Sequence, residues 1–206
     1  PVGLIWQNNS CAYDCVLTVL CQIWKEDVNL WSNMFAEVNT DWLGRLSNML
    51  RRYTAGLTSF ENVRDELRQK YAILDPVHMR YGSFTYVSKV LQPLFLNDRP
   101  VRSSIIVCSS INDGILEETM SFYSIRDWVS HDSWERQGSR CSACGAVTHR
   151  RYNWNMLPNL LAFSLSGTQH ELREIDTEFT LADVHTVRKT YKLRGIIYHS
   201  GNHFTA

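Results

Sequence analysis

The hydrophobic pattern changes once along this chain of 206 residues, and that change constrains the fold more than any other feature. Between residues 11 and 96 apolar side chains recur every three or four positions, which predicts helices over 11–24, 42–50, 58–71 and 86–94. After the turn-forming run 97–100, short β-branched or alternating segments predict strands at 101–107, 120–128, 160–165 and 191–198. Helices followed by strands indicate an α+β fold whose two halves pack together.

Local signals mark the ends of three of these helices. Ser10 directly precedes the first helix and is a candidate N-cap. Thr58 and Glu61 have the spacing of a capping box, so the third helix is expected to open at Thr58. Pro93 should kink or end the fourth helix, because proline lacks the N–H that a helix interior needs.

Composition and charge exclude several classes of protein. Hydrophobic residues make up 44% and charged residues 20%, a balance typical of a folded globular chain. The 21 basic and 21 acidic side chains cancel, which argues against a nucleic-acid partner. No run approaches the roughly 20 apolar residues of a membrane span, so we expect no membrane partner. The start at Pro1 has neither a signal peptide nor an initiator Met, so a fragment of a longer protein is expected.

The cysteines favour a reducing, intracellular compartment, either cytoplasm or nucleus. Six in 206 residues are too few for a disulfide scaffold, and their spacing is uneven. Such thiols serve packing, metal binding or chemistry.

The first segment with chemical potential lies at the start of the chain. Cys11 falls in the first turn of the first predicted helix, where exposed amides and the helix dipole favour a thiolate. The polar run Gln7, Asn8 and Asn9 just before it offers amide donors for a developing oxyanion. A cysteine inside a helix is nevertheless more often a small core residue.

The second segment, residues 191–206, lies at the other end of the chain. It reads as a strand, a short polar turn and a second strand beginning near His203. Cysteine proteases commonly bring a nucleophile and a base together from distant parts of the sequence, which Cys11 and His203 would do here. The alternative is that His203 is a solvated loop residue.

Together the two ends resemble the ubiquitin-specific proteases, a family of papain-like deubiquitinases. Gly3-Leu4, Asn9-Ser10-Cys11 and Leu17 fit the family's cysteine box, with Asp14 where the box has Asn. The family's histidine box, Tyr-x-Leu-x-Ala-Val-x-x-His-x-Gly and then Gly-His-Tyr-x-Ala, is matched by Tyr191, Leu193, Gly195, Ile196, His199, Gly201, His203, Phe204 and Ala206.

The resemblance implies roles for these residues. Cys11 would be the nucleophile and His203 its general base, with His199 in a supporting role and no cofactor for catalysis. The family's oxyanion Asn aligns with Trp6, so Gln7, Asn8 or Asn9 would have to substitute. The Asp or Asn that orients the histidine is expected beyond Ala206. Residues 1–206 would form a single catalytic domain, with a helical thumb (1–97), a β-rich palm with reduced fingers (98–206), and the cleft between them.

The implied activity is that of a thiol isopeptidase cleaving after the C-terminal Gly-Gly of ubiquitin or a ubiquitin-like protein. The continuation Asp14-Cys15-x-Leu17 is also similar to the divergent branch of the family that acts on SUMO, which makes SUMO the second choice of partner. A third reading is a catalytically silent module that only binds such a modifier.

A zinc site is the last prediction. Cys141 and Cys144 form a CxxC knuckle followed by Gly145, and zinc takes four ligands. Cys108 with either His131 or His149 would complete the set, and the family resemblance supports a structural zinc in the fingers. The alternatives are a relic knuckle with reduced thiols, or a nucleic-acid module built on the CxxC, against which the zero net charge argues.

Overall fold

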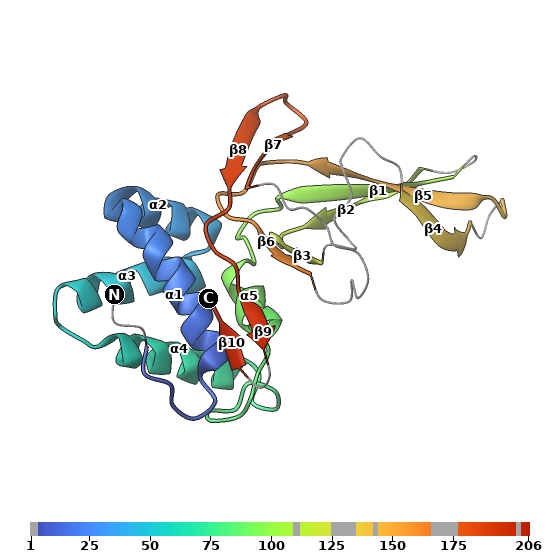
Figure 1. Cartoon of the computed structure of the whole chain (residues 1–206). Coiled ribbons are helices and arrows are strands. Elements are labelled where there is room, and N and C mark those ends of the chain that lie inside the picture. Colours follow the sequence, from blue (N-terminus) through green and yellow to red (C-terminus); the bar gives the residue numbers. More distant parts are fainter. Residues whose placement is uncertain (1–3, 109–111, 125–134, 142–143, 166–176, 201–202) are drawn as a thin grey trace. The chain divides into compact units, whose positions relative to one another are not determined.

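The computed structural model describes residues 4–108, 112–124, 135–141, 144–165, 177–200 and 203–206 (Figure 1). Their contacts divide the chain into two compact units. The helical unit comprises residues 1–95 and 193–206, and the strand unit comprises residues 96–192. The α+β class is confirmed. The expected division at residue 97 lies beside the boundary after Phe95, but residues 193–206 group with the helices rather than with the strands.

The helical unit is built around its first helix, α1 (Cys11–Glu26). The other elements are α2 (Val28–Val38), the π-helical η1 (Thr40–Gly44), α3 (Arg45–Thr54), α4 (Phe60–Leu74), α5 (Val87–Leu94) and the hairpin of β9 (Tyr198–Ser200) and β10 (His203–Thr205). Helix α1 contacts α2, α4, α5 and β10, which explains why ten of its residues are buried. The helix that carries Cys11 is therefore the core of this unit.

The helix ends differ in detail from the sequence prediction. Helix α2 was not expected; Asp27 caps it by accepting from the N–H groups of Asn29 and Leu30 at 3.1 and 2.9 Å. Helix α4 is capped by Ser59, whose Oγ accepts from the Asn62 N–H at 3.1 Å, so Thr58 as the opening residue was wrong. Helix α5 ends one residue after Pro93, as expected. None of the described helices is long and apolar enough to cross a membrane.

The strand unit contains one larger sheet and two small ones. Its strands are β1 (Arg102–Val107), β2 (Asn112–Glu118), β3 (Phe122–Ser124), β4 (Glu135–Arg140), β5 (Val147–Trp154), β6 (Ala162–Ser164), β7 (Glu178–Ala182) and β8 (Arg188–Lys192). The four-stranded antiparallel sheet has the order β2-β1-β5-β4, while β3 pairs in parallel with β6 and β7 forms a hairpin with β8. Val101, Tyr123, Trp154, Leu181 and Tyr191 form a buried core.

The single strand predicted over 191–198 was wrong. Tyr191 belongs to β8, which pairs with β7, whereas Tyr198 begins β9, which pairs with β10. Residues 193–197 between them form no strand. At Gly195 the backbone lies against Val19 of α1, so this segment packs on a helix instead of continuing a ladder.

Candidate active site

Cys11 and His203 line the same open pocket, although they lie at opposite ends of the sequence. Cys11 is the first residue of α1 and is 7% exposed; His203 is the first residue of β10 and is exposed. The pocket measures about 480 Å³, and its other lining residues are Leu4, Trp6, Asp14, Cys15 and Phe204. It lies within the helical unit, because the C-terminal hairpin groups with the helices, whereas a cleft between the two halves was expected.

Hydrogen bonds within the first turn fix the start of α1. The Ser10 side chain, fully buried, accepts from the Gln7 N–H at 3.0 Å and donates to a carboxylate oxygen of Asp14 at 2.6 Å. Ser10 occupies the N-cap position of α1, as predicted, but its side chain makes no cap hydrogen bond to a helix N–H. The first turn places Cys11 where the peptide dipoles of the helix favour an anion.

Two neighbours of Cys11 on α1 were not predicted as pocket residues. Asp14 and Cys15 follow Cys11 by three and four positions, so they share one face of the helix, and that spacing was the available signal. Burial raises the pKa of the Asp14 carboxyl above its ordinary value. The Ser10 hydrogen bond and the charge of Arg64 lower the pKa but do not cancel the effect of burial. Burial, together with the charges of Asp14 and Cys11, raises the pKa of the Cys15 thiol to about 11. Cys15 is therefore a protonated thiol at neutral pH.

Two aromatic side chains, Trp6 and Phe204, line the pocket together with His203. The ring centroids of Trp6 and His203 lie 6.3 Å apart in an edge-on arrangement. Phe204, the next residue of β10, stacks on Phe84 at 6.2 Å and packs against His199 at 4.8 Å. His199 thus contacts a wall of the pocket without lining the pocket itself.

The expected oxyanion donors lie beside the pocket, not among its lining residues. The Asn9 side-chain amide donates to the Gly82 carbonyl at 3.0 Å. The backbone carbonyls of Gln7 and Asn8 accept hydrogen bonds from Arg68. Trp6, in contrast, does line the pocket.

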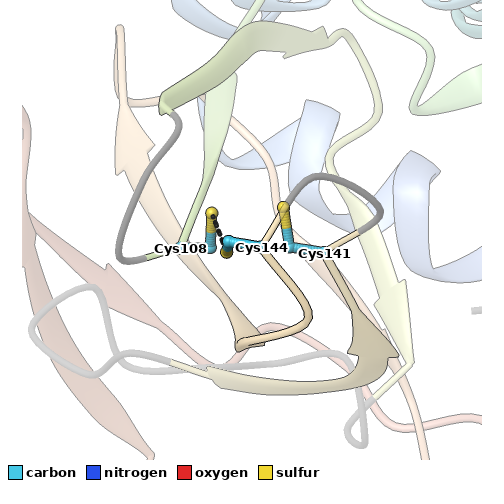
Figure 2. Close-up of side chains that lie close together, drawn as sticks. All are labelled: Cys108, Cys141 and Cys144. Carbon is cyan, nitrogen blue, oxygen red and sulfur yellow. Dashed lines mark hydrogen bonds between the residues drawn. The ribbon is translucent and has the colours of Figure 1, made fainter.

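Three of the four predicted metal ligands meet in the strand unit. The sulfur atoms of Cys108, Cys141 and Cys144 all lie within 4.8 Å of one another, and those of Cys108 and Cys144 are 3.5 Å apart (Figure 2). Next to the CxxC pair, the Gly145 N–H donates to the Cys141 carbonyl at 2.9 Å, and Gly145 has a φ of +66°. Glycine adopts this left-handed conformation without strain.

The donor set suits a metal that prefers sulfur ligands, such as zinc, since three cysteine sulfurs that form no disulfide lie close together. His149 is described but is not part of this group. His131, the other candidate for the fourth ligand, lies outside the described residues.

A search against protein-family models and a search of curated proteins each gave no match to this chain.

Proposed function

We propose that the chain is a thiol isopeptidase of the ubiquitin-specific protease type, with the papain-like fold of that family. The single observation that carries the proposal is the pocket shared by Cys11 and His203. A thiol at a helix N-terminus and an imidazole that line one pocket are the pairing that cysteine hydrolases use. The proposed substrate is ubiquitin or a ubiquitin-like protein joined through its C-terminal glycine to a lysine amine.

The reaction would proceed in two stages. His203 accepts the proton of the Cys11 thiol, and the thiolate sulfur attacks the glycine carbonyl. The C–N bond then breaks, the imidazolium returns the proton to the departing amine, and a thioester remains on Cys11. Water, deprotonated by the same imidazole, attacks the thioester carbonyl and releases the modifier with a free carboxylate. The thiolate recovers its proton from His203.

The walls of the pocket suit a tail without side chains. Trp6 and Phe204 present aromatic surface on the histidine side, and Cys15 stays a neutral thiol on the α1 side. Apolar walls of this kind accommodate the backbone of a Gly-Gly segment. The arrangement is compatible with a glycine tail.

A silent binding module is the second candidate, and it rests on the oxyanion side of the pocket. Trp6 offers an indole N–H rather than a side-chain amide, and the Asn9 amide is already bound to Gly82. If no other donor stabilises the tetrahedral intermediate, turnover would fall by roughly 100- to 1,000-fold, the usual loss for one oxyanion donor. Such a protein would bind the modifier and release little product.

Hydrolysis of modifier C-terminal amides tests the proposal. Ubiquitin and SUMO, each carrying a fluorogenic amine, are assayed with the wild type, Cys11→Ala and Cys21→Ala. Cys21 is a matched control because it is buried in the same helix and does not line the pocket. We expect Cys11→Ala to abolish turnover and Cys21→Ala to preserve it. Undiminished turnover by Cys11→Ala would exclude the mechanism, and binding without turnover in the wild type would favour the silent module.

We also propose that Cys108, Cys141 and Cys144 hold a structural zinc ion, with His131 as the sequence candidate for the fourth ligand. The convergence of three sulfurs from two separate segments supports this. When bound, the ion would link Cys108, which follows β1, to Cys141 and Cys144, which lie between β4 and β5, without taking part in catalysis.

A further inference from the structure

We infer that two buried arginines of α4, Arg64 and Arg68, are positioning residues that hold Trp6 and Cys11 in place. The inference rests on the proposed function, since it concerns the same pocket. Both side chains are almost completely buried, with 0% and 1% exposure. Neither lines the pocket, so any influence they have on the chemistry passes through the residues they bind.

Arg64 binds residues that precede Cys11 in the chain and a residue that follows it. Its Nη1 donates to the Ile5 carbonyl at 2.7 Å, to the Asp14 carboxylate at 3.2 Å and to the Ser10 hydroxyl at 3.4 Å. Ile5 lies in the opening loop (residues 4–10), Ser10 directly precedes Cys11, and Asp14 lies one helical turn after it. One guanidinium therefore ties the loop to the first turn of α1.

Arg68 holds the part of the loop that Arg64 does not reach. It donates to the Gln7 carbonyl from Nη1 at 3.2 Å and to the Asn8 carbonyl from Nη2 at 2.6 Å. The guanidinium also lies over the rings of Tyr81 and Tyr13, with centroid distances of 4.4 and 5.3 Å. These rings restrict the arginine to one position, from which both carbonyls are bound.

Trp6 is fixed because its neighbours on both sides are anchored to α4. The Ile5 N–H donates to the Glu61 carboxylate at 3.3 Å while the Ile5 carbonyl binds Arg64. The Gln7 carbonyl on the other side binds Arg68. The Trp6 indole lines the pocket and lies edge-on to His203. A shift of the loop would therefore change the shape of the pocket and the surroundings of His203 at the same time.

The loop needs this support because its backbone is strained. Asn8 and Asn9 have φ values of 50° and 59°, in the left-handed region that non-glycine residues seldom occupy. Such conformations persist only where the surroundings fix them, and they cluster at functional sites. The Arg68 contacts to the carbonyls of residues 7 and 8 fall at the start of this strained stretch.

The arginines are poorly explained by stability alone. Burying a guanidinium carries a desolvation penalty that an apolar side chain of similar size avoids. Nη2 of Arg64 has no hydrogen-bond partner among the described residues, which adds to that penalty. A planar fork of five donors is, however, well suited to binding several loop oxygens at once, and lysine lacks that geometry.

The test compares Arg64→Lys and Arg68→Lys with the control Arg45→Lys. Arg45 is an exposed arginine that pairs with Glu66 of α4 at 3.0 Å and lies outside the pocket. We expect kcat for modifier-amide hydrolysis to fall about tenfold or more in the two buried-arginine variants, with KM within about twofold, because misplaced reacting groups slow the chemical step. The control should keep the wild-type kcat.

Amide hydrogen exchange separates positioning from general stability and does not depend on turnover. We expect exchange to accelerate in residues 5–11 of each buried-arginine variant, with the interior of α1 still protected. Unchanged exchange in the loop, or equal acceleration throughout the helical unit, would overturn the inference. If the wild type hydrolyses no modifier, the proposed function fails. Two measurements still decide whether the arginines hold the loop: amide hydrogen exchange in residues 5–11 and the rate at which iodoacetamide alkylates Cys11.

Discussion

Gly195→Ala is expected to destabilise the helical unit, because the structure leaves no space for a methyl group at this position. A Cβ built on Gly195 would lie 2.7 and 2.9 Å from the two methyl carbons of Val19. Carbon atoms in favourable contact are about 3.5–4.0 Å apart, so both contacts are strongly repulsive.

The expected loss is about 1 kcal/mol of unfolding free energy. Overpacking a well-packed core typically costs about 1–3 kcal/mol, and this clash, between an exposed glycine and a half-buried valine, should fall in the lower part of that range. Replacing glycine by alanine also restricts the unfolded chain, which offsets about 0.4–1 kcal/mol. For a chain of this size, each kcal/mol lowers the unfolding midpoint by about 2–4 °C. Because Gly195 lies in the segment leading to β9 and β10, the shift should also displace His203 and lower turnover.

A double-mutant cycle with Val19→Ala gives the assay. Urea unfolding followed by far-UV circular dichroism is measured for the wild type, both single variants and the double variant. Removing the two Val19 methyl groups should relieve the clash, so Gly195→Ala should cost at least about 1 kcal/mol less in the Val19→Ala background. Equal stability of Gly195→Ala and the wild type, or strictly additive effects, would refute the steric argument.

Two further results are expected. Cys141→Ser should lose the zinc that the wild type retains after dialysis, while the control Cys21→Ser keeps it. Mass spectrometry of the metal measures the zinc content, and a metal-free wild type would contradict the proposed site. The free energy of unfolding should fall as the pH rises above about 10. Burial raises the pKa of Tyr13 to about 12 and that of Tyr71 well above its ordinary value. The unfolded chain therefore loses these two protons at a lower pH than the folded chain does. Urea unfolding at pH of about 8 and about 11 measures this, and equal midpoints would contradict it.

The helical part of the fold was largely predictable, since its apolar residues keep a regular period. Helix α1 is the clearest case: its buried face repeats along the whole of 11–24, and the structure extends it only to Glu26. Helix α2 was missed because its cap, Asp27, stands only one residue beyond α1, so the two helices follow each other without a loop signal. Adjacent helices of this kind are distinguished by packing, which sequence periodicity does not report.

The second half was harder to predict because its strand pairing is not local. The segment 191–198 looks like one strand, yet its two ends pair with different partners, β7 and β10. The cause is tertiary: Gly195 approaches Val19, a residue near the other end of the chain. Cys108, by contrast, was predicted to join the CxxC pair because zinc needs further ligands, and the structure brings the three sulfurs together.

For the candidate site, the sequence indicated the residue types but not their supports. Cys11 and His203 could be selected because a thiol at a helix start and a histidine in a hairpin have recognisable contexts. Arg64 and Arg68 could not, because charged residues at helical spacing usually face solvent, and only the folded structure shows them buried beneath the opening loop.

The most direct test of the central proposal is to identify which sulfur reacts with a modifier that carries an electrophile at its C-terminus. Cys11 and Cys15 line the same pocket, but the pKa of Cys15 is raised to about 11, so it should remain an unreactive thiol at neutral pH. After reaction with a ubiquitin or SUMO probe, peptide mass spectrometry should find the adduct on Cys11, and His203→Ala should slow its formation. An adduct on Cys15, or none with any modifier, would contradict the proposal.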